Sequence, residues 1–161
     1  MTRVSDTTSG APGALRRALP FFICALVCVI VGGLLSAAAA YIITQKIAWA
    51  VAYIVLVAGV AQAGLGAALG WLAQRARPAV VWAAFVLWNL GNIGVVAGQL
   101  SGALAATMAG GALLVVALVL TIIASRRGAP THLLLLWGFR VLVVVLAVSI
   151  PTGLVLAALG R

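Results

Sequence analysis

The sequence predicts an all-α protein, a polytopic membrane bundle of five transmembrane helices, with four helices as the alternative. Of its 161 residues, 66% are hydrophobic and 7% are charged, and the mean hydropathy is +1.31. A soluble domain carries roughly 25% charged and about 45–50% apolar residues. Successive uncharged runs each reach the roughly 20 residues that cross the hydrocarbon core of a bilayer. We therefore expect a lipid bilayer to be the solvent of this chain.

The first two spans are separated by a short polar break. Residues 1–19 are polar and basic, and we expect them to form a flexible cytoplasmic tail. An uncharged run from 20 to 44 follows, which is too long for the 7–15-residue apolar region of a signal peptide, so we expect a retained first span. Gln45 and Lys46 interrupt the apolar sequence, and the second span is expected at 47–73.

A long uncharged run follows Pro78 and must fold back on itself. A single helix over residues 79–125 would be about 70 Å long, more than twice the roughly 30 Å of the hydrocarbon core. Gly98–Gly102 combines two glycines with two polar side chains, a composition typical of a turn. We expect spans at 79–97 and 103–124, whereas the four-helix alternative would keep one overlong helix.

The fifth span is expected at 141–160, between Arg140 and Arg161. The apolar stretch from Thr131 to Phe139 has two possible roles: a segment in the membrane interface, or the first turns of the same helix. We treat 20–161 as a single transmembrane domain.

The basic residues are distributed unevenly about these five spans. One side of the membrane would hold Arg3, Arg16, Arg17, Arg75, Arg77, Arg126, Arg127 and Arg140. Only Lys46 and Arg161 would lie on the other side. Because short cytoplasmic loops are enriched in Lys and Arg, we expect a cytoplasmic N-terminus and an extracytoplasmic C-terminus. The expected location is a bacterial inner (cell) membrane.

The net charge of +9 does not indicate a nucleic-acid partner, because the basic residues lie in short gaps between apolar runs rather than on one soluble face. Membrane lipid is the expected partner instead. The candidate contacts for anionic headgroups are Arg16, Arg17, Arg75, Arg77, Arg126 and Arg127.

Amide side chains mark the third span as a candidate binding element. Asn89, Asn92 and Gln99 would share one side of a helix, and Gln62 near the middle of the second span is the natural partner for them. Buried amides are costly in hydrocarbon unless they are paired. The stripe is therefore an interhelical clamp, a patch that recognises a ligand or partner helix, or part of a conducting path.

Arg140 and the small residues give two further signals. Because an intramembrane cation is costly, Arg140 is expected either to reach the cytoplasmic surface or to meet an anion from a partner. Small residues four apart let helices approach closely, within one bundle or between proteins. These stripes are Gly32–Ser36–Ala40, Gly59–Ala63–Ala67, Gly66–Gly70, Gly94–Gly98 and Gly102–Ala106–Gly110.

Side chains that could carry catalysis are scarce. The chain has one acid, Asp6, and one histidine, His132, so it lacks a carboxylate pair, a Ser–His–acid triad and a three-ligand zinc site. Cys24 and Cys28 have the wrong spacing for a C-x-x-C redox pair. We therefore expect no enzymatic activity, no metal and no cofactor.

Two functional hypotheses remain. The first is a small non-catalytic integral membrane protein that acts as an accessory or assembly subunit and binds lipid and other membrane proteins, or a second copy of itself. The alternative is a small oligomeric transporter or channel whose path is lined by Asn89, Asn92 and Gln99. Neutral amides and arginines would favour a neutral or anionic solute over a cation.

Overall fold

The computed structural model describes residues 11–41, 44–126 and 133–158, and this part of the chain is helical apart from short turns. Five helices in it are long and apolar enough to cross a membrane. The predicted all-α class and the five spans are therefore confirmed, and the chain is a multi-pass membrane protein. The tail over residues 1–10, Arg3, Arg127, His132 and Arg161 lie outside the described residues.

The first helix, α1 (Ala11–Ala38), begins nine residues before the expected start at Pro20, so residues 11–19 are helical rather than part of a tail. Packing explains this extension. Ala14 and Ala18 are buried, and a Cβ added at Gly70 would lie 2.8 Å from the carbonyl oxygen of Ala14. The early turns of α1 thus bury small side chains against the end of the second span. A 3₁₀ turn, η1 (Ala39–Tyr41), follows α1.

The second span is one continuous helix from Gln45 to Leu72 that alternates between α and π geometry. It consists of α2 (Gln45–Tyr53), η2 (Ile54–Ala61), α3 (Gln62–Ala67) and η3 (Ala68–Leu72). The hydroxyl of Thr44 caps its start by accepting a hydrogen bond from the backbone N–H of Ile47 at 3.3 Å. The two π segments are uncommon, because π turns usually occur singly within α-helices.

Glycines join α1 to this second span along its whole length. A Cβ at Gly32 would collide with Val55, one at Gly59 would lie 2.7 Å from Val29, and one at Gly66 would lie 2.5 Å from Phe21. Close approach of this kind is how helices associate in lipid, where hydrophobic burial gives little driving force. The glycines of these small-residue stripes therefore serve internal packing, whereas Ser36 and Ala40 of the first stripe are exposed.

The helices α4 (Pro78–Ser101) and α5 (Leu104–Ser125) form the tightest pair. Their turn is shorter than the predicted Gly98–Gly102 segment, because Gly102 alone, at φ 75°, provides the left-handed cap that ends α4. A Cβ at Gly110 would lie 2.5 Å from the backbone nitrogen of Val95, and one at Gly94 would lie 3.0 Å from Gly110 Cα. The two backbones are in direct contact.

The last helix, α6 (Leu133–Ala158), settles the two roles considered for the stretch before Arg140. Residues 133–139 are the first turns of this helix and not a separate interfacial segment. Among the side chains of α6 that the structure describes, Phe139 and Leu146 are buried, and a Cβ at Gly64 would lie 2.5 Å from Leu142. Most other described side chains of α6 are exposed, and Pro151 lies inside the helix.

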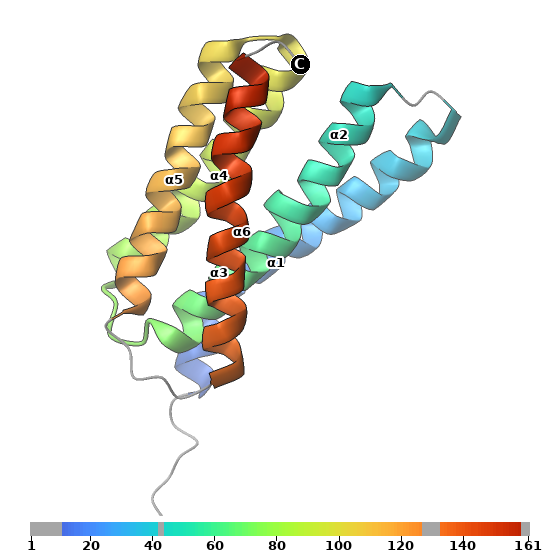
Figure 1. Ribbon diagram of the computed structural model, residues 1–161. Coiled ribbons are helices and arrows are strands. Elements are labelled where there is room, and N and C mark those ends of the chain that lie inside the picture. The colour runs from blue at the N-terminus through green and yellow to red at the C-terminus, as the bar shows by residue number, and fades with distance from the viewer. Residues whose placement is uncertain (1–10, 42–43, 127–132, 159–161) are drawn as a thin grey trace, which may run out of the picture.

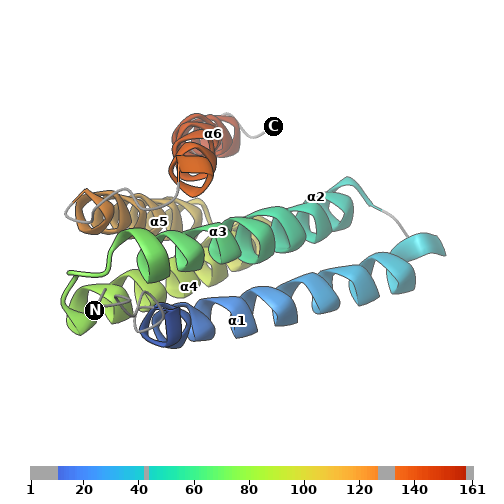
Figure 2. The ribbon, with the colours of Figure 1, turned by 90° about the horizontal axis from the view of Figure 1, so that it is seen from below.

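The helices converge at one end of the molecule and diverge at the other (Figure 1). The start of α1, the end of η3, the start of α4, the end of α5 and the start of α6 meet at the lower end of the view, which we call the basic end. It carries Arg16, Arg17, Arg75, Arg77 and Arg126, and Lys46 lies at the opposite end. The second view confirms that α1 and the second span leave the group formed by α4, α5 and α6 (Figure 2).

Candidate functional site

Asn89 on α4 is half-buried and forms a side-chain hydrogen bond to another helix of the described bundle. Its Nδ2 donates to the carbonyl oxygen of Phe85 at 2.8 Å, within the same helix. Its Oδ1 accepts a hydrogen bond from Cys24 Sγ at 3.1 Å, which joins α4 to α1. Asn89 thus acts as part of a clamp, with a cysteine rather than an amide as its partner.

Asn92, one turn further along α4, points into the core and is 4% exposed. Its Nδ2 donates to the carbonyl oxygen of Trp88 at 2.9 Å, but its Oδ1 has no hydrogen-bond partner. The indole Nε1 of Trp88, also fully buried, has none either. This turn of α4 therefore offers one unused acceptor and one unused donor.

Gln62 has the least satisfied side chain of this interior. It is fully buried where η2 ends and α3 begins, and neither atom of its amide has a hydrogen-bond partner. The expected pairing with the asparagine stripe is not found, since no hydrogen bond between described residues joins Gln62 or the half-buried Gln99 to Asn89 or Asn92.

Gln62, Trp88 and Asn92 therefore leave buried donors and acceptors without partners among the described residues. Leaving a buried donor or acceptor unsatisfied costs roughly 1–3 kcal/mol. The hydroxyl of Tyr53 is a further buried group without a hydrogen-bond partner. Neither this hydroxyl nor the indole of Trp88 was identified from the sequence. For Trp88 the sequence signal is a Trp in the middle of a span, away from the interfacial belt where such residues are usual.

At the basic end, Arg17 ties α1 to the end of the second span. Its Nη1 donates to the carbonyl oxygens of Gln74 at 2.6 Å and Ala73 at 3.3 Å. These carbonyls follow the last turn of η3, where backbone acceptors lack partners within the helix. Arg17 therefore has a structural role beside the lipid contact expected of it.

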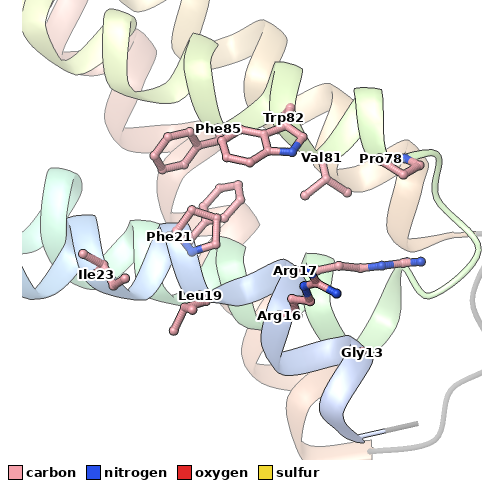
Figure 3. A pocket seen from close by; sticks show the side chains of 11 residues that line it. Gly13, Arg16, Arg17, Leu19, Phe21, Ile23, Pro78, Val81, Trp82 and Phe85 are labelled. Carbon is pink, nitrogen blue, oxygen red and sulfur yellow. The ribbon is translucent and has the colours of Figure 1, made fainter.

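A groove of about 680 Å³ opens beside Arg17, between the first half of α1 and the start of α4 (Figure 3). Its aromatic wall consists of Phe21, Trp82 and Phe85, whose rings meet edge to face. The centroid separations are 5.1 Å for Phe21–Phe85 and 5.7 Å for Trp82–Phe85. The other lining residues are Gly13, Arg16, Arg17, Leu19, Pro20, Ile23, Pro78 and Val81.

Arg140 is exposed on α6, with its Cζ 5.4 Å from the centroid of the Trp137 ring. Trp137 lies one turn closer to the start of α6, and helical side chains lean toward the N-terminus of their helix. The guanidinium therefore lies toward the basic end and forms a cation–π contact. The described residues contain no Asp or Glu that could pair with it.

The remaining candidate residues are three arginines at the basic end and two cysteines in α1. Arg75, Arg77 and Arg126 are exposed at the basic end, where a headgroup could reach them. Cys24 and Cys28 are free thiols in α1. Within residues 11–41, 44–126 and 133–158, no group of three His, Cys, Asp or Glu side chains could hold a metal ion.

Comparison with protein-family models, with curated proteins and with solved structures finds no significant match.

Proposed function

We propose that this chain is a non-catalytic accessory or assembly subunit of the inner membrane, which binds another membrane protein and anionic lipid. Its basic end would face the cytoplasm, as would its N-terminus, in agreement with the enrichment of arginine in cytoplasmic loops. One carboxylate and one histidine in the whole sequence leave little for acid–base chemistry.

The observation that carries this proposal is the exposed arm, formed by residues 26–41 of α1 and η1 and residues 44–53 of α2. This arm leaves the α4–α6 group and has side chains exposed on most of its surface (Figure 1). Leu26 is 62% exposed, Leu34 is 66% exposed and Tyr41 is 98% exposed. A two-helix arm that packs against little else in its own chain offers both of its flanks to a neighbouring transmembrane helix.

The small-residue stripes narrow the location of the partner surface. Gly32 and Gly59 are used between α1 and the second span, and Gly94 and Gly110 are used between α4 and α5. A partner must therefore bind the outer apolar faces of the arm rather than these glycines. Gly33 also lies on the arm but is not used in packing within the chain, since a Cβ added there would meet nothing within 4 Å.

Site-specific photo-crosslinking in intact membranes tests the proposal. A photoreactive residue at Leu34 on the arm should yield one discrete protein adduct, from a partner or from a second copy of the chain. Val144 on α6 is a matched control, because it is 62% exposed against 66% for Leu34. Adducts to lipid alone at both positions would refute the proposal, as would equal protein adducts at the two positions.

The buried polar groups without partners favour the alternative function, an oligomeric transporter or channel for a neutral or anionic solute. Gln62, Trp88 and Asn92 provide donors and acceptors that the described protein does not use. Solute flux in proteoliposomes distinguishes this candidate. It requires flux that is lost in Asn89→Leu and Asn92→Leu and kept in Val144→Leu, and the absence of flux from the unmodified protein would eliminate it.

A further inference from the structure

We propose that the groove between α1 and α4 binds one anionic diacyl phospholipid, with its phosphate at Arg16 and an acyl chain along Leu19, Ile23 and Trp82. This inference deepens the lipid-binding part of the proposed function and does not depend on the partner surface of the arm.

The length of the groove suits one leaflet of a bilayer. On α1 its lining extends from Gly13 to Ile23, which spans about 15 Å at 1.5 Å per residue. This is about half of the roughly 30 Å hydrocarbon thickness. The volume of about 680 Å³ lies within the roughly 300–1,000 Å³ usual for ligand sites.

Polarity changes along the groove in the same order as along a phospholipid. Arg16, Arg17 and Pro78 lie at one end, at the basic end of the bundle, and the rings of Phe21 and Phe85 lie at the other (Figure 3). Basic pockets between transmembrane helices on the cytoplasmic side are typical sites for anionic headgroups. The basic mouth and apolar depth therefore match a headgroup phosphate and an acyl chain.

Arg16 and Arg17 have different roles at the basic mouth of the groove. Arg17 is occupied, because its Nη1 donates to the carbonyls of Ala73 and Gln74. Arg16 is exposed and forms no hydrogen bond with the other described residues, so its guanidinium is available for a phosphate. With no Asp or Glu in the described part of the chain, no carboxylate there competes with the phosphate for Arg16.

Gly13 provides a way to block the groove without disturbing the fold. It lines the groove, and a Cβ added there would meet nothing within 4 Å. Gly33, on the same helix but outside the groove, also has open space around its added Cβ. Gly13→Phe and Gly33→Phe are therefore matched substitutions, one inside the groove and one outside.

The test is native mass spectrometry of the full-length protein after reconstitution with phosphatidylglycerol and phosphatidylcholine in equal amounts. Wild type and Gly33→Phe should retain one lipid, mostly phosphatidylglycerol. Gly13→Phe should lose the retained lipid, whereas Arg16→Gln should keep a lipid but lose the preference for phosphatidylglycerol by about fivefold. Arg126→Gln, which removes a charge at the same end but outside the groove, should keep the preference.

Two outcomes would overturn the inference. One is retention of phosphatidylglycerol in Gly13→Phe at the wild-type level. The other is an equal loss of preference in Arg16→Gln and Arg126→Gln, which would show a general attraction to the basic end. Circular dichroism and gel filtration identify a variant that fails to fold, and smaller substitutions, Gly13→Leu with Gly33→Leu, then repeat the comparison. The arm crosslink at Leu34 is a separate readout and can fail or succeed independently.

Discussion

At the residue scale, the sequence predicted which amide side chains are buried but not which groups they contact. Asn89, Asn92 and Gln62 were singled out as costly in lipid, and Gln62 and Asn92 are indeed buried. The expected pairing of Gln62 with them is not found, because the pairing rested only on similar depth in two spans, and depth does not decide which side chains meet. Gln62 directly follows the eight-residue π segment η2, a departure from α-helical geometry that the sequence did not indicate.

The unpaired amide of Gln62 leads to a first prediction. Gln62→Met should raise the free energy of unfolding in detergent by about 1–3 kcal/mol, because it removes a buried donor and acceptor that no described residue pairs. Unfolding in mixed micelles, followed by circular dichroism, measures the change. A loss of stability would instead show that Gln62 is held by water or a bound molecule. Retained stability with a lost arm crosslink or lost solute flux would assign Gln62 to function.

The two neighbouring arginines of α1 should differ in their effect on stability. Arg17→Gln should lower the free energy of unfolding by about 1–2 kcal/mol, because the carbonyls of Ala73 and Gln74 lose a charged donor. Arg16→Gln should change it by no more than about 0.5 kcal/mol in lipid-free detergent. Equal effects of the two substitutions, in the same unfolding assay, would contradict the separate roles given to them here.

At the element scale, the sequence predicted the turns better than the starts of the helices. The turn after α4 is predicted from the length of the uncharged run and from the two glycines of Gly98–Gly102. The structure shows that Gly102, in the left-handed conformation, is the residue that ends α4. The predicted start of α1 is nine residues too late, because the basic residues Arg16 and Arg17 indicated a polar tail rather than the first turns of a helix. Side chains long enough to reach the membrane surface allow the helix to continue past them.

Substitutions at glycine should separate packed from free helix faces. Gly110→Ala should destabilise the protein by about 1–3 kcal/mol, because the new Cβ would lie 2.5 Å from a backbone nitrogen that cannot move aside. Gly33→Ala, which meets nothing within 4 Å, should be neutral or slightly stabilising. Thermal unfolding in one detergent compares the pair, and a neutral Gly110→Ala would show that α4 and α5 are less closely packed than described.

At the scale of the whole molecule, the number of spans and the segregation of arginines followed from composition, because hydrocarbon thickness fixes helix length. The composition did not predict that the arm diverges from α4–α6. It depends on which small residues meet, such as Gly32 with Val55 and Gly110 with Val95, and such pairings are not readable from one sequence.

The five-span arrangement predicts that the two chain ends lie on opposite sides of the membrane. Reporter fusions at Met1 and Arg161 should give signals for opposite compartments, with the N-terminal reporter in the cytoplasm. Cysteine labelling in a Cys24→Ala, Cys28→Ala background adds a check within the chain. Arg75→Cys should react from the same side as the N-terminus, and Tyr41→Cys from the other. Both ends in one compartment would contradict the arrangement.

The divergence of the helices has one more consequence, for the lipid around the protein. Since the arm leaves the other helices on the side away from the basic end, its exposed apolar side chains lie in the leaflet farther from the arginines. Acyl chains of that leaflet, rather than protein, then surround the tip of the arm wherever no partner is bound.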